Sequence, residues 1–243
     1  MISSKKTTEM IIKHKFIDAE FINRPNRFLT RVKVGSEIIE SHLPDPGRLK
    51  ELLIPGAQVL LKYENSVNRK TKFSTQAVYL DNILISLNTH LPNQFVSYLL
   101  KNKKIAFLNE WEFDRSEVNY GNSRFDFQLK KDALYMILEV KSATLVENGI
   151  AKFPDAITER GRRHVQHLGA LAKEGLNTMI LFVVQRSDAI CFQPQWDRDP
   201  KFANALYNAW KNGLQVRVIK MGMSKKTLSY LGEIPFYLNR IKT

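Results

Sequence analysis

The first third of the chain alternates apolar and polar residues in short runs that are separated by turn residues. Residues 28–34 (Phe-Leu-Thr-Arg-Val-Lys-Val) alternate with period two, Gly35 and Ser36 provide a turn, and residues 37–42 resume the alternation. This pattern predicts a β-hairpin. Similar runs predict three further strands, at 57–63, 76–80 and 83–86.

Between the hairpin and the next strand, the sequence predicts one short helix. Asp45 and Pro46 fit its N-cap and its first position, the leucines within 49–53 fall on one face, and the Pro-Gly pair at 55–56 ends it. Several strands interrupted by one short helix indicate a small β-barrel of the OB type.

The rest of the chain changes to a mixture of helices and strands. Helices are predicted at 89–104, at 155–174 and from Asp199-Pro200 to Gly213. On the long central helix, the stripe expected to be buried comprises Ile157, Gly161, His164, Leu168 and Leu171 or Ala172. Strands are predicted at 112–120, 123–130, 134–141, 178–185, 189–193 and 214–220. This order is typical of an α/β unit in which the long helix connects neighbouring strands.

We therefore expect two units, which together make the chain α+β overall. Residues 1–85 form the OB-type barrel, and residues 86–243 form the α/β unit with a mixed sheet. Neither internal repeats nor a low-complexity linker separate the two units, so we expect them to pack closely.

Composition places the chain among ordinary globular proteins. Of its 243 residues, 44% are hydrophobic and 25% are charged, which is enough for a core without disulfides. The single cysteine, Cys191, excludes a disulfide framework and a cysteine-based zinc cluster.

The longest apolar run, Met179 to Val184, is far shorter than the ~20 residues of a membrane helix. The N-terminus also lacks the apolar region of a secretory signal, so we expect a cytoplasmic protein without a membrane partner.

The charge adds information about the partner. The chain carries 37 Lys and Arg against 24 Asp and Glu, a formal net charge of +13, of which +5 falls in residues 1–87 and +8 in residues 88–243. A positive field over both units attracts polyanions, nucleic acid first, with acidic membranes or proteins as alternatives. A generally basic proteome would give the same composition. The sequence leaves the oligomeric state open, a homodimer included.

The clearest indication of a functional site is a pair of neighbouring predicted strands that contain acidic residues. If the turn centres on residues 132–133, residues whose numbers add up to 265 face each other, which places Asp126 opposite Glu139. Because side chains alternate along a strand, Glu139 and Lys141 share a face, and Asp126 joins them there. Charged groups amid apolar neighbours are costly unless they bind something.

This set fits a divalent metal site. Asp126 and Glu139 offer the oxygen ligands that Mg²⁺ prefers, with Mn²⁺ as an alternative, and Lys141 could hold an attacking water or neutralise charge at phosphorus. A salt-bridged pair on an exposed face is the alternative explanation of the same spacing. On the long helix, Glu159 and Arg163 form a predicted i,i+4 pair, and Arg160, Arg163 and His167 could reach a phosphate backbone. An ordinary solvated basic face is the alternative there.

Three motifs resemble a known family. Residues 153–161 (Phe-Pro-Asp-Ala-Ile-Thr-Glu-Arg-Gly) with His164, residues 123–127 (Ser-Arg-Phe-Asp-Phe) and residues 139–145 (Glu-Val-Lys-Ser-Ala-Thr-Leu) look like the sugar fermentation stimulation protein A (SfsA) family. Residues 42–50 (His-Leu-Pro-Asp-Pro-Gly-Arg-Leu-Lys) resemble the archaeal-type form of its first-domain signature. The resemblance implies an OB-fold domain followed by a PD-(D/E)XK nuclease-like domain, DNA binding, and a regulatory role in sugar metabolism.

Carried over to this chain, the nuclease pattern falls on Asp126, Glu139 and Lys141. Glu159, Arg160 and His164 would support the site from the long helix, although His164 could equally be a packed residue of the fold. Many nucleases of this fold add an acid on the first core helix, but residues 89–104 contain none. Glu117 or Glu159 is expected to take its place.

Basic residues of both units are candidates for DNA contact. They are Arg48, Lys62, Arg69, Lys70 and Lys72 in the barrel, and Arg124, Arg160, Arg163 and His167 in the second unit. Aromatic residues on barrel strands (Phe28, Tyr63, Phe73 and Tyr79) lie among these cations, an arrangement that suits single strands, although part of them must belong to the core. Three functions remain open: a Mg²⁺-dependent deoxyribonuclease, a DNA-binding regulator that uses the same fold without cutting, or an RNA-directed function.

Overall fold

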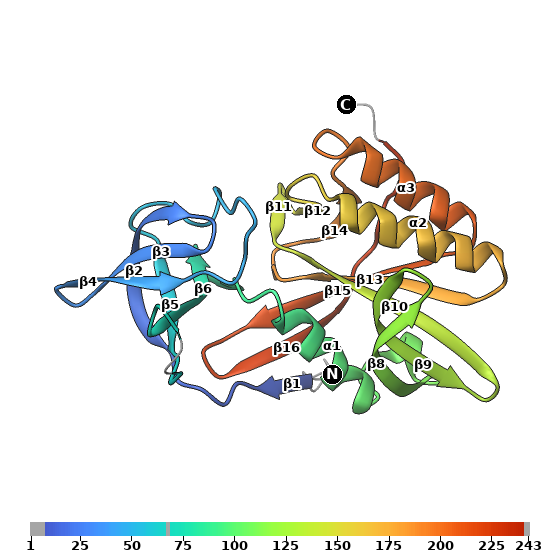
Figure 1. The fold of residues 1–243 in the computed structure, drawn as a ribbon, viewed down its shortest axis with the longest axis horizontal. Helices are drawn as coiled ribbons and strands as arrows, with labels where there is room; N and C mark the ends of the chain where they lie inside the picture. Colours follow the sequence, from blue (N-terminus) through green and yellow to red (C-terminus); the bar gives the residue numbers. More distant parts are fainter. Residues whose placement is uncertain (1–7, 67–68, 241–243) are drawn as a thin grey trace, which may run out of the picture.

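The first unit of the chain is a β-barrel, drawn in blue and cyan in Figure 1. We describe it from a computed structural model that covers residues 8–66 and 69–240. Its strands are β2 (Ile17–Asn26), β3 (Leu29–Val34), β4 (Glu37–His42), β5 (Gln58–Tyr63), β6 (Phe73–Leu80) and β7 (Ile83–Ser86). They follow the order β4-β3-β2-β5-β6-β7, and the contact between His42 of β4 and Ser74 of β6 closes five of them into a barrel. The predicted hairpin and the OB-type barrel are confirmed.

The predicted short helix after the hairpin does not form. Asp45 caps a tight turn, because its Oδ1 accepts a hydrogen bond from the Gly47 N–H at 2.7 Å, and Leu49 adopts a φ of 50°. The guanidinium of Arg24 donates hydrogen bonds to the carbonyl oxygens of Asp45, Gly47 and Arg48. These carbonyl groups accept hydrogen bonds from the Arg24 side chain and do not point along a helix axis. The leucines within residues 49–53 therefore lie in turns, from which they reach the core.

The second unit is built on a seven-stranded mixed sheet with the order β1-β16-β15-β13-β10-β9-β8. Its strands are β1 (Thr8–Ile11), β8 (Glu112–Tyr120), β9 (Ser123–Lys131), β10 (Leu134–Ala143), β13 (Asn177–Val184), β15 (Gln215–Met223) and β16 (Thr227–Glu233). Strand β10 runs parallel to β13, and β13 runs parallel to β15. The sequence pattern missed β1, β2 and β16. Strand β1, which precedes the barrel in the chain, pairs with β16 of the second unit.

Helices cover both faces of this sheet (Figure 1). Helices α2 (Glu159–Lys173) and α3 (Pro200–Lys211) pack together on one face, over a core that includes Ile180 and Phe182. Helix α1 (Leu91–Lys101), followed by a 3₁₀ turn (Ala106–Leu108), packs on the other face, over a core that includes Leu138 and Leu181. The near-continuous apolar sequence of β13 is explained by burial on both faces.

The segment before α2 differs from the prediction. Helix α2 begins at Glu159, because the Thr158 hydroxyl caps it by accepting a hydrogen bond from the Gly161 N–H, and Ile157, expected in the buried stripe, is 74% exposed. The expected loop around Gly149 contains two strands instead. Strands β11 (Leu145–Glu147), β12 (Ile150–Phe153) and β14 (Cys191–Pro194) form a small separate sheet.

Contacts between the two units include an apolar one and a close backbone approach. Leu60, Ala77 and Leu84 of the barrel form a small apolar cluster that Met223 of β15 packs against. At the close approach, Gly47 lies so near the second unit that a Cβ atom on it would stand 2.6 Å from the Oδ2 atom of Asp155. The motifs around Gly47 and Asp155 therefore touch across the junction. Within the described parts of the chain, we find no helix with the length and apolarity needed to span a membrane.

Candidate metal-dependent site at the end of β10

The site is built on the β9–β10 hairpin, whose register agrees with the prediction. Leu134 faces Lys131, and the pairing continues to Leu138 facing Phe127, so that paired residue numbers add up to 265. The backbone pairing ends there, one residue before Asp126 and Glu139 would face each other. The two strands therefore separate at the position where the carboxylates stand.

Asp126 occupies the opening between the separating strands. Its Oδ2 accepts a hydrogen bond from the Val140 backbone N–H at 2.7 Å, which replaces the missing pairing between the two strands. Its Oδ1 accepts from the Nδ2 of Asn93 on α1 at 2.6 Å. The alternation of β9 breaks at this point, because Phe125 packs in the core beneath α2 and Phe127 in the core beneath α1. Asp126 is thus fixed between the two layers, rather than on the face that carries Glu139 and Lys141.

Glu139 lies on the α2 side and is 3% exposed. Its Oε1 contacts the Nζ of Lys141 at 2.5 Å and the Nδ1 of His164, on α2, at 2.6 Å. Its Oε2 is buried and has no hydrogen-bond partner within residues 8–66 and 69–240. A buried carboxylate oxygen without a partner is costly, unless a ligand satisfies it. We call Asp126, Glu139, Lys141 and His164 the carboxylate cluster.

The two carboxylates differ in their protonation. Burial, and after it the negative charge of Glu139, raise the pKa of Asp126 to about 6. Burial alone would also raise the pKa of Glu139, but the hydrogen bond from His164 and the charge of Lys141 outweigh it and lower that pKa. A positive ion beside Asp126 would reverse the rise, because it removes the repulsion between the two groups.

Asp126 is accessible from a hollow of about 330 Å³ between α1 and β8. Asn93 and Ser97 line it from the helix, and Ser116 and Glu117 line it from the strand. Glu117 has a φ of 58° and forms an ion pair with Arg124 at 2.9 Å. Of the two residues expected to replace the missing helix acid, Glu117 is the one that shares this hollow with Asp126. The sequence analysis missed Asn93, although its place in the first turn of a helix that packs on the sheet was a usable signal.

Glu159 and Arg160 do not join the carboxylate cluster. Across the described residues, no hydrogen bond or ion pair links either of them to it. Glu159 pairs with Arg162 at 3.7 Å, an i,i+3 contact in place of the predicted i,i+4 pair with Arg163, and Arg160 is exposed. The structure thus shows no direct polar contact of these two residues with the cluster, and their support of the site from the helix stays a prediction.

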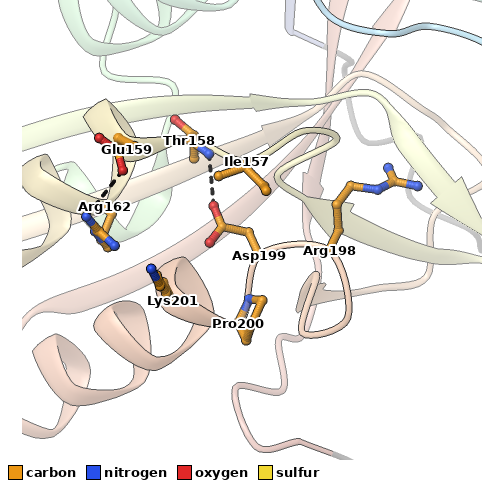
Figure 2. A pocket seen from close by; sticks show the side chains of 8 residues that line it. All are labelled: Ile157, Thr158, Glu159, Arg162, Arg198, Asp199, Pro200 and Lys201. Atoms are coloured by element: carbon orange, nitrogen blue, oxygen red, sulfur yellow. Dashed lines mark hydrogen bonds and ion pairs between the residues drawn. The ribbon is translucent and has the colours of Figure 1, made fainter.

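A separate hollow of about 230 Å³ lies where α2 and α3 begin, and Figure 2 shows the residues that line it. Asp199 joins the two helices there. One of its carboxylate oxygens accepts from the Thr158 N–H and the other from the Phe202 N–H, both at 2.9 Å. Basic residues surround it, but the Thr158 and Phe202 N–H groups are occupied by Asp199, and the Gly161 N–H is occupied by the Thr158 hydroxyl. We interpret this hollow as a structural joint that sets the position of α2.

The predicted DNA-contact residues occupy two regions of the molecule. In the barrel, Arg48, Arg69, Lys70 and Lys72 are exposed, and Lys62 pairs with Glu64 at 3.0 Å. In the second unit, Arg124, Arg160 and Arg163 are exposed, and the Nδ1 of His167 is 2.8 Å from the Ser123 hydroxyl. His164 is buried against Phe125, and its Nδ1 contacts Glu139. The same ring therefore packs in the core and takes part in the carboxylate cluster.

The donor set of the cluster fits a hard divalent cation. The unpartnered Oε2 of Glu139 and the carboxylate of Asp126 are oxygen ligands of the kind that Mg²⁺ and Ca²⁺ prefer. No group of three or more His, Cys, Asp or Glu side chains in residues 8–66 and 69–240 is arranged to hold a metal. Such a cation would therefore take its remaining ligands from water, backbone carbonyl groups or a substrate, as Mg²⁺ commonly does.

The fold and the site define an α+β protein with an OB domain, followed by a mixed-sheet domain with a carboxylate cluster on two neighbouring strands and a helix. Comparison with known proteins extends this description. Residues 22–87 match the family model described as the SfsA N-terminal OB domain, and residues 90–227 match the sugar fermentation stimulation protein RE domain. The chain belongs to the sugar fermentation stimulation protein (SfsA) family.

Relatives of the chain carry the same name. Sugar fermentation stimulation protein homologs of Clostridium kluyveri and Methanosphaera stadtmanae are each 42% identical to it, over 85% and 87% of this chain and 90% of either relative. The solved structure of Pyrococcus furiosus SfsA in complex with Ca²⁺ superposes with a TM-score of 0.85 at 25% identity, over 94% of this chain and 98% of the other.

Proposed function

We propose that this protein binds DNA and hydrolyses its phosphodiester bonds with the help of Mg²⁺, for which Mn²⁺ could substitute. The observation that carries the proposal is the carboxylate cluster. Among the described residues, one oxygen of the buried Glu139 has no partner while the other is paired with Lys141, and burial, followed by the charge of Glu139, raises the pKa of Asp126 across an opening between two strands. Ionisable groups perturbed in this way cluster at functional sites.

Asp126 and Glu139 would hold the metal ion. When bound, a divalent cation supplies charge stabilisation at the phosphate and lowers the pKa of a coordinated water. The binding of Ca²⁺ by the Pyrococcus furiosus relative supports a site for a hard cation in this family fold. The position of Asp126 depends on the Val140 N–H and on Asn93, so α1 and β10 together set the distance between the two carboxylates.

Lys141 and His164 have different roles in this proposal. The Nζ of Lys141 is fixed by Oε1 of Glu139, from where it can donate hydrogen bonds to an attacking water or to a phosphate oxygen that gains charge. His164 touches the site through Glu139 alone and is a positioning residue. Its Nδ1 holds Oε1 of Glu139, which leaves Oε2 free for the metal ion.

Binding would depend on the positive charge of both units. The exposed Arg124 belongs to the β9 strand that also carries Asp126, and the exposed Arg163 is one residue before His164. Phosphate contacts of such residues position a nucleic acid without reading its sequence. We therefore expect phosphate-dominated binding, and no base-specific readout in a major groove.

The test is a cleavage assay on single-stranded, duplex and branched DNA with Mg²⁺, with Mn²⁺ or with EDTA. We expect Asp126→Asn and Glu139→Gln to abolish cleavage and metal affinity, and Lys141→Ala to abolish cleavage but leave metal affinity largely intact. DNA binding in EDTA should stay equal or tighten in the two carboxylate variants, because a negative charge near the phosphate is gone. Asp197→Asn removes an acid whose side chain is 85% exposed and serves as the matched control.

Calorimetry and circular dichroism complete the test. A wild-type protein without measurable affinity for Mg²⁺ or Mn²⁺ would refute the enzymatic proposal. Unfolding of Glu139→Gln would show that Glu139 and Lys141 are a structural pair instead. Loss of DNA binding in all three folded variants would assign the cluster to the DNA-binding surface.

One observation favours a second function, a DNA-binding regulator that does not cut. The residue of α1 that reaches Asp126 is Asn93, an amide, and α1 carries no acidic residue in its first turn. An amide adds no charge to the metal site, which weakens the expected affinity for the cation. In this case wild-type protein binds DNA in EDTA and in Mg²⁺ alike and cleaves none of the substrates.

A further inference from the structure

A second candidate binding site lies on the barrel, outside the carboxylate cluster. It is a hollow of about 490 Å³ at the place where β4 leaves β3 and meets β6, within the size range of ligand sites. Phe28 and Leu29 at the start of β3, Glu40 and His42 at the end of β4, and Arg69 and Lys70 before β6 line it. We call it the Phe28 hollow.

An aromatic ring is held half-exposed in this hollow. The side chain of Phe28 is a large apolar group that is 51% exposed. Its backbone is fixed on both sides, because the Phe28 N–H donates to the Oδ1 of Asn26 and the Phe28 carbonyl accepts from the Leu43 N–H, each at 2.9 Å. A ring that is presented on a rigid backbone offers a flat apolar surface at low entropic cost.

The hollow also holds a histidine ring. Among residues 8–66 and 69–240, the buried Nδ1 of His42 has no hydrogen-bond partner. The backbone of His42 is fixed by its pairing with Leu29 on one side and with Ser74 on the other. Burial, and after it the charge of Arg69, lower the pKa of His42, which favours the neutral ring. A neutral imidazole can exchange hydrogen bonds with the polar edge of a planar ligand.

Positive charge lies at one side of the hollow. Arg69 and Lys70 are both exposed, whereas Glu40, the acid of the hollow, is paired with Arg31 at 3.2 Å. The hollow therefore combines an apolar ring, a histidine ring and two cations. Bases of single strands are bound by this combination of stacking and backbone attraction.

We propose that the Phe28 hollow binds one unpaired nucleobase of a single-stranded nucleic acid together with its phosphate. The base stacks on Phe28 and its edge lies against the His42 ring, while Arg69 and Lys70 hold the phosphate. This inference rests on the nucleic-acid binding proposed above, and it specifies that function: the preferred substrate contains a single-stranded segment. A base inside a duplex is covered by its neighbours and cannot reach the ring.

The experiment measures binding of the full-length protein in EDTA, where cleavage plays no part. Fluorescence anisotropy compares a short single-stranded DNA, the RNA of the same sequence, and the DNA duplex. Phe28→Ala should weaken binding of the single-stranded probes by about 5- to 100-fold, the range expected for one stacked base, and leave duplex binding unchanged. Tyr237→Ala, which removes an aromatic side chain that is 52% exposed in the second unit, is the matched control and should change neither.

Two further measurements make the result specific. A probe with a 2-aminopurine base should be quenched on binding to wild-type protein and not on binding to Phe28→Ala, because stacking causes the quenching. Arg69→Ser with Lys70→Ser should lower the log–log salt slope of single-strand binding by about two. If the binding of only one single-stranded probe, DNA or RNA, depends on Phe28, that probe identifies the nucleic acid that supplies the base.

The outcomes separate this inference from the proposed function. Equal losses for single-stranded and duplex probes, or no loss in a Phe28→Ala variant that circular dichroism shows to be folded, would overturn the inference and leave the proposed function intact. Phe28-dependent binding by a protein that never cleaves DNA would support the inference and count against the nuclease. A wild-type protein without affinity for any of the probes would overturn both.

Discussion

Removal of the Asp199 carboxylate should destabilise the protein more than any change of an exposed acid. Asp199 is 3% exposed, and its two oxygens accept hydrogen bonds from the Thr158 and Phe202 N–H groups at the starts of two helices. Figure 2 shows the bond to Thr158. Loss of an N-cap costs about 1 kcal/mol, and a buried N–H left without a partner costs about 1–3 kcal/mol. We therefore expect Asp199→Ala to lower the free energy of unfolding by about 2–4 kcal/mol.

Urea denaturation at pH 7 followed by circular dichroism measures this loss as a change in midpoint at constant slope. Asp199→Asn keeps one acceptor oxygen and should lose about half as much, because its amide N–H₂ cannot accept the second bond. Asp197→Ala, a change at an exposed side chain two residues away, should stay within about 0.5 kcal/mol of wild type. A loss below about 1 kcal/mol for Asp199→Ala, or equal losses for Asn and Ala, would refute the assignment of two hydrogen bonds to this carboxylate.

Three further predictions concern charge and packing. The pKa of Asp126, about 6, lies above its ordinary value of 3.8, so between these values the folded state binds more protons, and in EDTA this group lowers stability as pH rises from about 4 to 6. The stability of Asp126→Asn relative to wild type should therefore rise by up to about 3 kcal/mol between pH 4 and pH 8; an equal difference at both pH values would contradict the shift. A Cβ on Gly169 would stand 2.9 Å from the Ala209 Cα, so Gly169→Ala should cost about 1–3 kcal/mol in thermal or urea denaturation, and an unchanged midpoint would show that α2 and α3 can move apart. Because both units are positive, filter binding to DNA should weaken steeply with salt, and a flat response would refute the charge argument.

Local patterns were enough to predict the framework of the site. The β9–β10 register follows from the position of one turn and from the strict alternation of side chains along a strand. This alternation correctly placed Glu139 beside Lys141. The end of the pairing at Asp126 was not predictable in this way. It depends on Asn93, which lies 33 residues earlier and approaches only after α1 packs on the sheet.

The errors have similar physical causes. The sequence of the loop after β4 is compatible with a short helix, and the guanidinium of Arg24, more than 20 residues away, holds its carbonyl groups in another arrangement. Strand β2 carried a readable signal, because Ile17, Ala19 and Phe21 alternate with polar residues as a half-buried strand does. Strand β1 has a weak pattern of four residues, and its place was set by a distant partner.

The pairing of β1 with β16 has a consequence for the order of events during synthesis. Residues 8–11 leave the ribosome before the barrel, yet their partners in residues 227–230 are more than 200 residues further along the chain. At translation rates of about 5–20 residues per second, this strand waits roughly 10–40 s for its partner. The barrel, by contrast, has its own core within residues 17–87 and can fold during that interval. The nascent chain would thus carry a finished barrel next to an incomplete sheet, whose edge strand arrived first and is paired last.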